Sequence, residues 1–161
     1  MPELFSAEEL VNIAIREEVT GATYYRAVAE GAESRDLKEF ATRVARMEDE
    51  HAEQFRRLLG ELSGQKTPPK DYDGEYGDYL AYLVGGRIFP MGEDGAELAR
   101  RQESDLQAVE TAAGMEKNTL LLYGELMQFV PEAERFALRA IMDEERQHLL
   151  QLARFKELLM A

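Results

Sequence analysis

Cysteine is absent from the 161 residues of this chain. Its absence excludes disulfides, a thiolate nucleophile, and zinc or iron–sulfur sites with cysteine ligands. Long apolar runs are absent too, because no stretch approaches the roughly 18 consecutive apolar residues of a membrane helix. The N-terminal stretch MPELFSAEEL is acidic and lacks the profile of a signal peptide. We therefore take the cytoplasm as the default location and expect no membrane partner.

Basic residues are scarce relative to acidic ones. The chain has 19 lysines and arginines against 32 aspartates and glutamates, which gives a net charge of −13 and a pI of about 4.6. This charge would repel phosphate groups, so nucleic acid is a poor partner. The length suits one domain over residues 1–161, large enough to bury a substantial core.

Four long segments repeat apolar residues at helical spacing, at about 6–33, 34–62, 105–130 and 131–160. Ser6 followed by Glu9 is a capping-box pattern at the start of the first segment, and Pro131 suits the first residue of the fourth. The links within the first pair and within the second pair are very short. Each pair should therefore form an antiparallel hairpin.

Glycine and proline are concentrated in the connection between the hairpins, at 63–104. The stretch 62–95 holds seven of the twelve glycines and three of the five prolines, with room for one short helix near 75–84. A helix of about 28 residues is about 42 Å long, and a connection of this length can span it. The second and third helices would then run parallel. The sequence thus predicts an all-α, four-helix bundle with one long crossover between helices two and three.

The two histidines of the chain each follow a glutamate by three residues, as Glu48 with His51 and Glu145 with His148. Both pairs lie midway along an apolar seam, in which the positions alternate steps of four and three. Residues at this spacing share one face of a helix. Both pairs are therefore expected to point into the core of the bundle.

The other two long helices place one glutamate each in the same kind of seam. Glu18 and Glu116 are followed seven residues later by Tyr25 and Tyr123. The spacing from this glutamate to the glutamate of the Glu-x-x-His pair is 30 residues in the first half and 29 in the second. The chain therefore has the pattern of one helical hairpin written twice.

Four glutamates and two histidines are thus expected at one level of one core. A buried carboxylate without a partner costs several kcal/mol or takes up a proton, and no lysine or arginine lies on these seams. Two divalent cations would balance the negative charges. Carboxylate and imidazole ligands together suit iron or manganese better than magnesium or calcium.

This constellation resembles the di-iron carboxylate proteins of the ferritin-like superfamily, in which two helices give one glutamate each and two give Glu-x-x-His. The short helix links, the Glu-to-Tyr spacing and the duplicated hairpin are most similar to the erythrin domain of rubrerythrins. The resemblance implies a ferritin-like bundle with two iron ions, or with manganese or a mixed pair. It also implies the ligand roles: bridging Glu48 and Glu145, terminal Glu18 and Glu116, and His51 and His148 on one metal each.

Two departures from rubrerythrins bear on the function. Rubrerythrins carry a rubredoxin domain whose iron is held by four cysteines, and this chain has no cysteine, so its electrons must come from a separate donor protein or reductant. Rubrerythrins also have a further glutamate one turn beyond the third-helix ligand, where this chain has Asn118, Thr119 and Leu120. The second departure argues against peroxidase rates like those of rubrerythrins.

The resemblance implies a non-haem di-iron oxidoreductase that reduces hydrogen peroxide or reacts with dioxygen. Three alternatives stay open: a ferroxidase that stores iron, a di-iron hydroxylase of a larger substrate, and a non-enzymatic, metal-stabilised bundle that acts as an adaptor. We also expect a homodimer. The stretch from Thr67 to Gly95 could serve as a hinge through which two chains exchange hairpins.

Several other residues have simpler interpretations. Tyr25 and Tyr123 are either core aromatics or donors of a hydrogen bond to a ligand carboxylate. The tyrosines of the crossover are expected to pack, to form a dimer surface or to cover a channel: Tyr72, Tyr76, Tyr79 and Tyr82. Four glutamates beside the seams are expected to be solvent-exposed charges: Glu17, Glu50, Glu110 and Glu144. Glu17 or Glu144 would replace its neighbour as a ligand if the helical phase were off by one.

Overall fold

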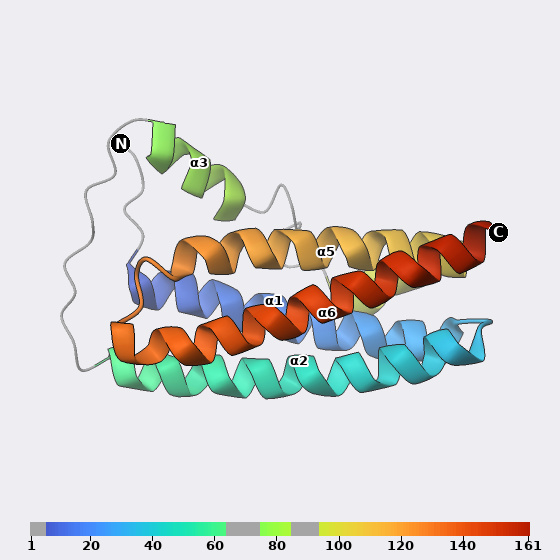
Figure 1. The fold of residues 1–161 in the computed structure, drawn as a ribbon, viewed down its shortest axis with the longest axis horizontal. Helices are drawn as coiled ribbons and strands as arrows, with labels where there is room; N and C mark the ends of the chain where they lie inside the picture. Colours follow the sequence, from blue (N-terminus) through green and yellow to red (C-terminus); the bar gives the residue numbers. More distant parts are fainter. Residues whose placement is uncertain (1–5, 64–74, 85–93) are drawn as a thin grey trace.

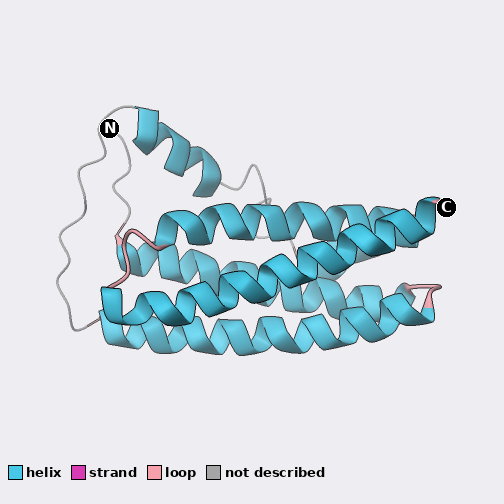
Figure 2. Ribbon diagram, in the orientation of Figure 1, coloured by secondary structure: helices cyan, strands magenta, loops and turns pink. Residues whose placement is uncertain are grey.

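The computed structural model describes residues 6–63, 75–84 and 94–161. Four long helices lie side by side and form a bundle (Figure 1): α1 (Ala7–Gly31), α2 (Arg35–Leu62), α5 (Asp105–Leu126) and α6 (Arg135–Met160). Helices α1 and α2 are antiparallel, as are α5 and α6, whereas α2 and α5 run in the same direction. The described residues contain helices and loops but no strand (Figure 2). The all-α bundle predicted from the sequence is confirmed.

Serine side chains cap the first helix of each hairpin. The N–H of Glu9 donates to Ser6 Oγ at 3.2 Å and the N–H of Ser6 donates to Glu9 Oε2 at 2.7 Å, which completes the predicted capping box. Ser104 caps α5 in the same way, through the N–H of Gln107 at 3.2 Å. The carboxylate of Asp105 then accepts the N–H of Ser34 at 2.8 Å. This bond ties the start of α5 to the link between α1 and α2.

The link between α5 and α6 differs from the prediction. Pro131 was expected to be the first residue of the last helix, but its ψ is 149°, and a 3-10 turn at Glu132–Glu134 follows before α6 begins at Arg135. Helix α5 ends at Leu126 rather than near residue 130, and Pro131 disfavours helical backbone at Val130 just before it. A short 3-10 turn is a common connector between helices.

The crossover contains the expected short helix α3 (Glu75–Val84) and also α4 (Gly95–Arg100), which was not predicted. The side chain of Asp94 caps α4 by accepting the N–H of Ala96 at 3.0 Å. Gly95 packs against the backbone of α1, where an added Cβ would lie 2.1 Å from the carbonyl oxygen of Thr20. Only glycine permits this approach. Tyr72 and most of the expected hinge from 67 to 95 lie outside the described residues.

Two apolar clusters fill the bundle, with a polar layer between them. The first contains Leu10, Val11, Phe55, Leu58, Leu122, Leu126, Leu138 and Ile141. The second contains Tyr24, Tyr25, Phe40, Val44, Val109, Ala112 and Leu152. Along each long helix the chain passes from one cluster through the layer to the other. The layer is therefore closed off from solvent at both ends by packed apolar side chains.

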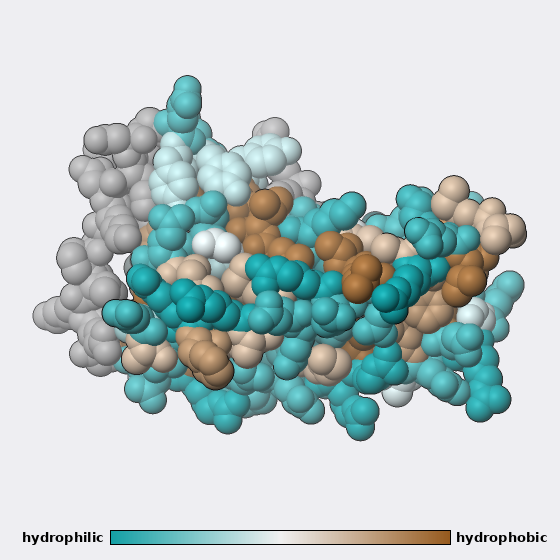
Figure 3. Space-filling view, viewed as in Figure 1, coloured by the Kyte–Doolittle hydropathy of each residue, from teal (hydrophilic) through white to brown (hydrophobic). Residues whose placement is uncertain are grey.

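The face of the molecule seen in Figure 3 is largely polar. Figure 3 shows hydrophilic side chains spread along the visible face, interrupted by smaller groups of hydrophobic ones. Among the described helices, none has both the length and the apolar composition needed to cross a membrane.

Candidate metal centre

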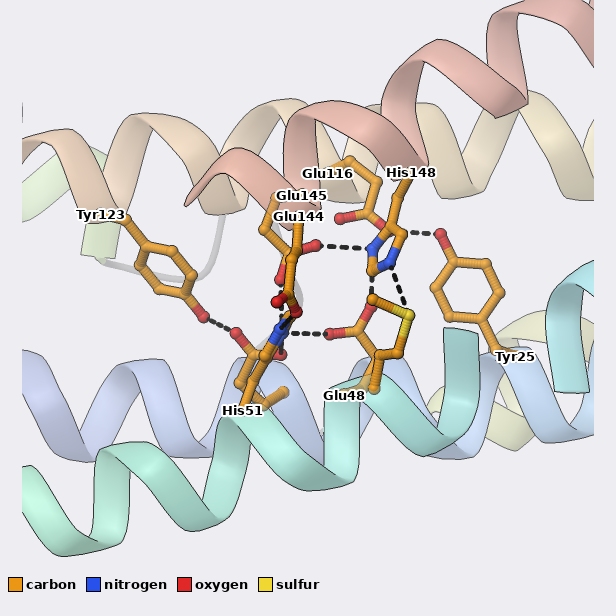
Figure 4. Close-up of polar contacts among 10 residues, drawn as sticks. Tyr25, Glu48, His51, Glu116, Tyr123, Glu144, Glu145 and His148 are labelled. Carbon is orange, nitrogen blue, oxygen red and sulfur yellow. Dashed lines mark hydrogen bonds and ion pairs between the residues drawn. The ribbon is translucent and has the colours of Figure 1, made fainter. Parts of the chain in front are cut away.

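Six buried polar side chains meet in the layer between the apolar clusters. Each is at most 4% exposed, although each can carry a charge. They are the six residues singled out in the sequence, and all four long helices of one chain contribute (Figure 4). The layer consists of Glu18 from α1, Glu48 and His51 from α2, Glu116 from α5, and Glu145 and His148 from α6.

The ligand atoms of these residues form two overlapping groups, each within 4.8 Å and each able to hold a metal ion. The groups are Glu18, Glu48, His51 and Glu145, and Glu48, Glu116, Glu145 and His148. Glu48 and Glu145 belong to both groups. Their carboxylates therefore lie between two positions, each of which has one further glutamate and one histidine.

His51 is surrounded by carboxylates on both edges of its ring. Its Nδ1 lies 2.7 Å from Glu145 Oε1, and 3.5 Å from both Glu18 Oε2 and Glu48 Oε2. Its Nε2 points the other way and lies 2.7 Å from Glu144 Oε2. The Nδ1 atom thus faces the layer, and the Nε2 atom faces a carboxylate outside it.

His148 has a comparable position on the other side of the layer. Its Nδ1 lies 2.9 Å from Glu145 Oε2 and 3.6 Å from Glu48 Oε1. The carboxylate of Glu116 is slightly further away, at 3.9 Å. Its Nε2 lies 3.5 Å from the sulfur of Met47. Both histidines therefore direct Nδ1 into the layer.

Two atoms of the layer are of the kind that a cation would satisfy. His51 Nδ1 and Glu145 Oε1 are buried and, within the described chain, have no hydrogen-bond partner, although they are 2.7 Å apart. A buried polar atom without a partner costs about 1–3 kcal/mol. Nitrogen and oxygen donors in this combination suit iron or manganese. A metal ligated by both atoms would satisfy them.

Comparison with known proteins agrees with this geometry. Residues 9–83 match the family model described as Rubrerythrin. A protein of Thermotoga maritima described as a ferritin-like diiron-carboxylate protein has the same fold, with a TM-score of 0.72 and 24% identity over 96% of this chain and 97% of that chain. The chain therefore has the ferritin-like fold, and its residues 9–83 are similar to rubrerythrins.

A second solved structure has the same fold as this chain. It is a hypothetical protein of Pyrococcus furiosus, with a TM-score of 0.68 and 23% identity over 97% of this chain and 91% of that chain. The comparison with curated proteins found no match.

Protonation in the metal-free layer follows from its burial. Burial raises the pKa of both Glu48 and Glu116 well above the ordinary value, and the neighbouring Glu145 raises both further. Burial alone would lower the pKa of His51, but the surrounding carboxylates, that of Glu145 first, raise it overall. Burial lowers the pKa of His148. Without metal the layer therefore retains protons, which divalent cations would displace on binding.

Two tyrosines connect the halves of the bundle. Tyr25 on α1 donates its hydroxyl hydrogen bond to Glu116 Oε1 on α5, and Tyr123 on α5 donates to Glu18 Oε1 on α1. Both tyrosines are at most 2% exposed. Both interpretations that the sequence allowed therefore hold, because the two tyrosines belong to the apolar clusters and each also donates a hydrogen bond to a carboxylate of the layer. Each phenol fixes the orientation of one outer carboxylate of the layer.

Of the four glutamates expected to be solvent-exposed charges, Glu144 is exposed but also contacts the layer, and Glu17 is partly buried. Glu144 is about half exposed, at 48% of its side chain, but its carboxylate also accepts the hydrogen bond of His51. Glu17 is half-buried, and burial raises its pKa to about 7. Glu50 and Glu110 are exposed, as expected, and Glu110 pairs with Lys156 at 2.9 Å.

The seam analysis missed Glu144 and Met47 as neighbours of the site. A seam gives the residues on the core-facing side of a helix and not those that reach across to the next helix. The available signal was the duplication, because Met47 and Glu144 each precede the glutamate of a Glu-x-x-His pair.

Proposed function

We propose that this chain binds two iron ions in the polar layer and is a non-haem di-iron oxidoreductase that reduces hydrogen peroxide or reacts with dioxygen. The observation that supports it is the composition of the layer. Four glutamates and two histidines are buried together, and the buried polar side chains of the described residues include no lysine or arginine. Such a layer has an excess of negative charge that two divalent cations balance.

The proposed ligand roles follow the two overlapping groups. Glu48 and Glu145, present in both groups, would be shared between the ions. Glu18 and His51 would complete one position, and Glu116 and His148 would complete the other: these are the residues unique to each group. When bound, the iron pair would supply two electrons and polarise the O–O bond of the oxidant.

The protein around the layer would orient ligands and exclude water. Tyr25 and Tyr123 hold the outer carboxylates through hydrogen bonds across the bundle. The apolar clusters at both ends separate the layer from bulk water. This environment strengthens electrostatic interactions inside the site and limits the oxidants that enter to small molecules.

Electrons would come from an external donor. The 161 residues contain no cysteine and hence no cysteine-ligated iron for internal electron transfer. The strongly acidic surface, with a net charge of −13, favours a donor that presents a basic surface.

The test is anaerobic loading with Fe(II), followed by iron analysis and by optical spectra after addition of hydrogen peroxide or dioxygen. We expect two iron ions per chain, oxidised by at least one of the two oxidants and re-reduced by an added donor. The matched control is a Glu18→Gln/Glu116→Gln variant, which keeps the shape of the layer but loses two negative charges. Iron accumulating far beyond two per chain would instead indicate storage. Metal binding without oxidation would indicate a metal-stabilised adaptor.

A further inference from the structure

The two halves of the duplicated hairpin differ at one equivalent position next to the site. Met47 precedes Glu48, and Glu144 precedes Glu145. Each side chain reaches the histidine of the opposite helix: Glu144 Oε2 lies 2.7 Å from His51 Nε2, and Met47 Sδ lies 3.5 Å from His148 Nε2. Figure 4 shows the Glu144 carboxylate directed at His51 from α6. The six residues of the layer are duplicated, but their outer partners are not.

The two outer partners have different chemistry. A carboxylate is a strong, charged acceptor, and a distance of 2.7 Å is typical of a charge-assisted hydrogen bond. A thioether sulfur is a weak acceptor. With its Nε2 proton held by Glu144, neutral His51 has its lone pair on Nδ1, the ring atom that faces the layer and lies 2.7 Å from Glu145 Oε1. A carboxylate behind a metal-ligating histidine fixes its tautomer and makes it a stronger ligand. His148 has no such support from Met47.

We propose that Glu144 is a positioning residue that makes the two metal positions unequal. The position with Glu18 and His51 fills first and binds more tightly, and the position with Glu116 and His148 fills second. This inference rests on the proposed binding of two metal ions and adds the order in which the two positions fill. Losing a carboxylate partner of this kind typically costs about 10–100-fold in metal affinity. The two dissociation constants should differ by a factor in that range.

The partial solvent exposure of Glu144 does not abolish the effect of its hydrogen bond on His51. The side chain of Glu144 is 48% exposed, but the ring of His51 is fully buried, so the hydrogen bond has one desolvated end. Glu144 also acts electrostatically on His148, so the inequality comes from its direct hydrogen bond to His51 and not from its charge alone.

The experiment uses the fact that the chain has only two histidines. Metal-free protein labelled with ¹⁵N-histidine gives two sets of ring signals, which a His51→Gln variant assigns. Zn(II) is then titrated as a diamagnetic probe while both rings are followed by NMR. We expect the first equivalent to shift the Nδ1 signal of His51 and the second to shift that of His148.

Three variants test the cause of the order. Glu144→Met gives both histidines the same partner, so the two rings should respond together and the tight step should weaken about 10–100-fold. Met47→Glu combined with Glu144→Met exchanges the partners and should reverse the order. Glu50→Gln is the control, because it removes the same charge from an exposed residue beside His51 and should leave the order unchanged.

The outcomes separate this proposal from the proposed function. If wild-type protein binds two Zn(II) ions but both rings respond together, or His148 responds first, the inequality is wrong and the two-metal site stands. If Glu144→Met leaves the order intact, Glu144 is not its cause. Fewer than two ions bound, or no shift of either ring, would overturn the two-metal site itself. The order in the wild type can be read even if a variant fails to fold.

Discussion

The hydroxyl of Tyr123, on α5, donates a hydrogen bond to the carboxylate of Glu18, on α1, although the two residues are 105 positions apart. Tyr25 and Glu116 make the reciprocal bond in the opposite direction between the same two helices. These two bonds join the first helix of each hairpin at the level of the polar layer. They hold together parts of the chain that the long crossover separates.

Replacing Tyr123 by phenylalanine should weaken metal binding at the position completed by Glu18. The carboxylate of Glu18 loses the donor that orients it, and we expect affinity at that position to fall about 10-fold or more. The metal-free protein should also lose about 1–3 kcal/mol of stability. Calorimetric titration with Mn(II) and thermal melting measure the two effects.

Tyr24→Phe is the matched control for that substitution. Tyr24 is equally buried, but its hydroxyl donates to the backbone carbonyl of Ala108 at 2.7 Å, away from the layer. It should reduce stability without changing metal affinity. Equal losses of affinity in both variants would mean that Tyr123 acts only through general packing.

Removing charge from the layer should leave the metal-free protein as stable as wild type or more stable, and should reduce the stability that metal binding adds. In a Glu18→Gln/Glu116→Gln variant, each amide oxygen can still accept the tyrosine hydrogen bond, but two ionisable carboxyls are gone. The metal-free variant should melt at the same temperature as wild type or higher, because buried charge or forced protonation is removed. Its gain in melting temperature on adding Fe(II) or Mn(II) should be largely lost. A variant that retains the full gain would show that these glutamates do not bind metal.

Glu17 should make stability depend on pH. Burial raises its folded-state pKa to about 7 from 4.5, so the folded state holds this proton more tightly than the unfolded chain. Stability from this group is fully present below about 4.5 and is lost as the pH rises through about 7. The total loss is roughly 3 kcal/mol.

Glu17→Gln should remove this part of the pH dependence and stabilise the protein at pH 8. Urea unfolding of both proteins between pH 4.5 and 8 measures it, with the exposed Glu50→Gln as control. The measurement is best made on metal-saturated protein, so that the layer itself does not titrate. Parallel stability curves for wild type and Glu17→Gln would contradict the prediction.

Gly95→Ala should detach the start of α4 from α1. A Cβ at this position would lie 2.1 Å from the carbonyl oxygen of Thr20 and 2.8 Å from the backbone N of Tyr24, so the backbone must move. We expect destabilisation of about 1–3 kcal/mol, or more, from this overpacking. Gly60→Ala is the control, since an added Cβ there meets nothing within 4 Å. Similar melting temperatures for Gly95→Ala and wild type would show that α4 does not pack in this way.

The seams of the long helices were sufficient to predict the fold and to bring the six layer residues together, because a step of three or four residues fixes which side chains face the core. The same reasoning could not find α4, since six residues hold too few turns to show a period. It misplaced the start of α6 because proline suits both a first helical position and the turn before one. It correctly expected Glu144 to be exposed but missed its contact with His51. A half-exposed glutamate that reaches a buried histidine on another helix has no signature in the spacing of one helix.

The last prediction concerns assembly. We expect a homodimer, seen as twice the chain mass by light scattering at micromolar concentration. In this structure one chain supplies the whole polar layer, so a dimer could form either from two closed chains or by exchange of hairpins through the crossover. Mixing two variants after unfolding and refolding distinguishes these arrangements. One variant carries His51→Gln in the first hairpin, and the other carries His148→Gln in the second. Exchange would create one intact layer in each mixed dimer and recover part of the wild-type metal binding. Two closed chains would recover none, and a monomeric mass would contradict the prediction of a dimer.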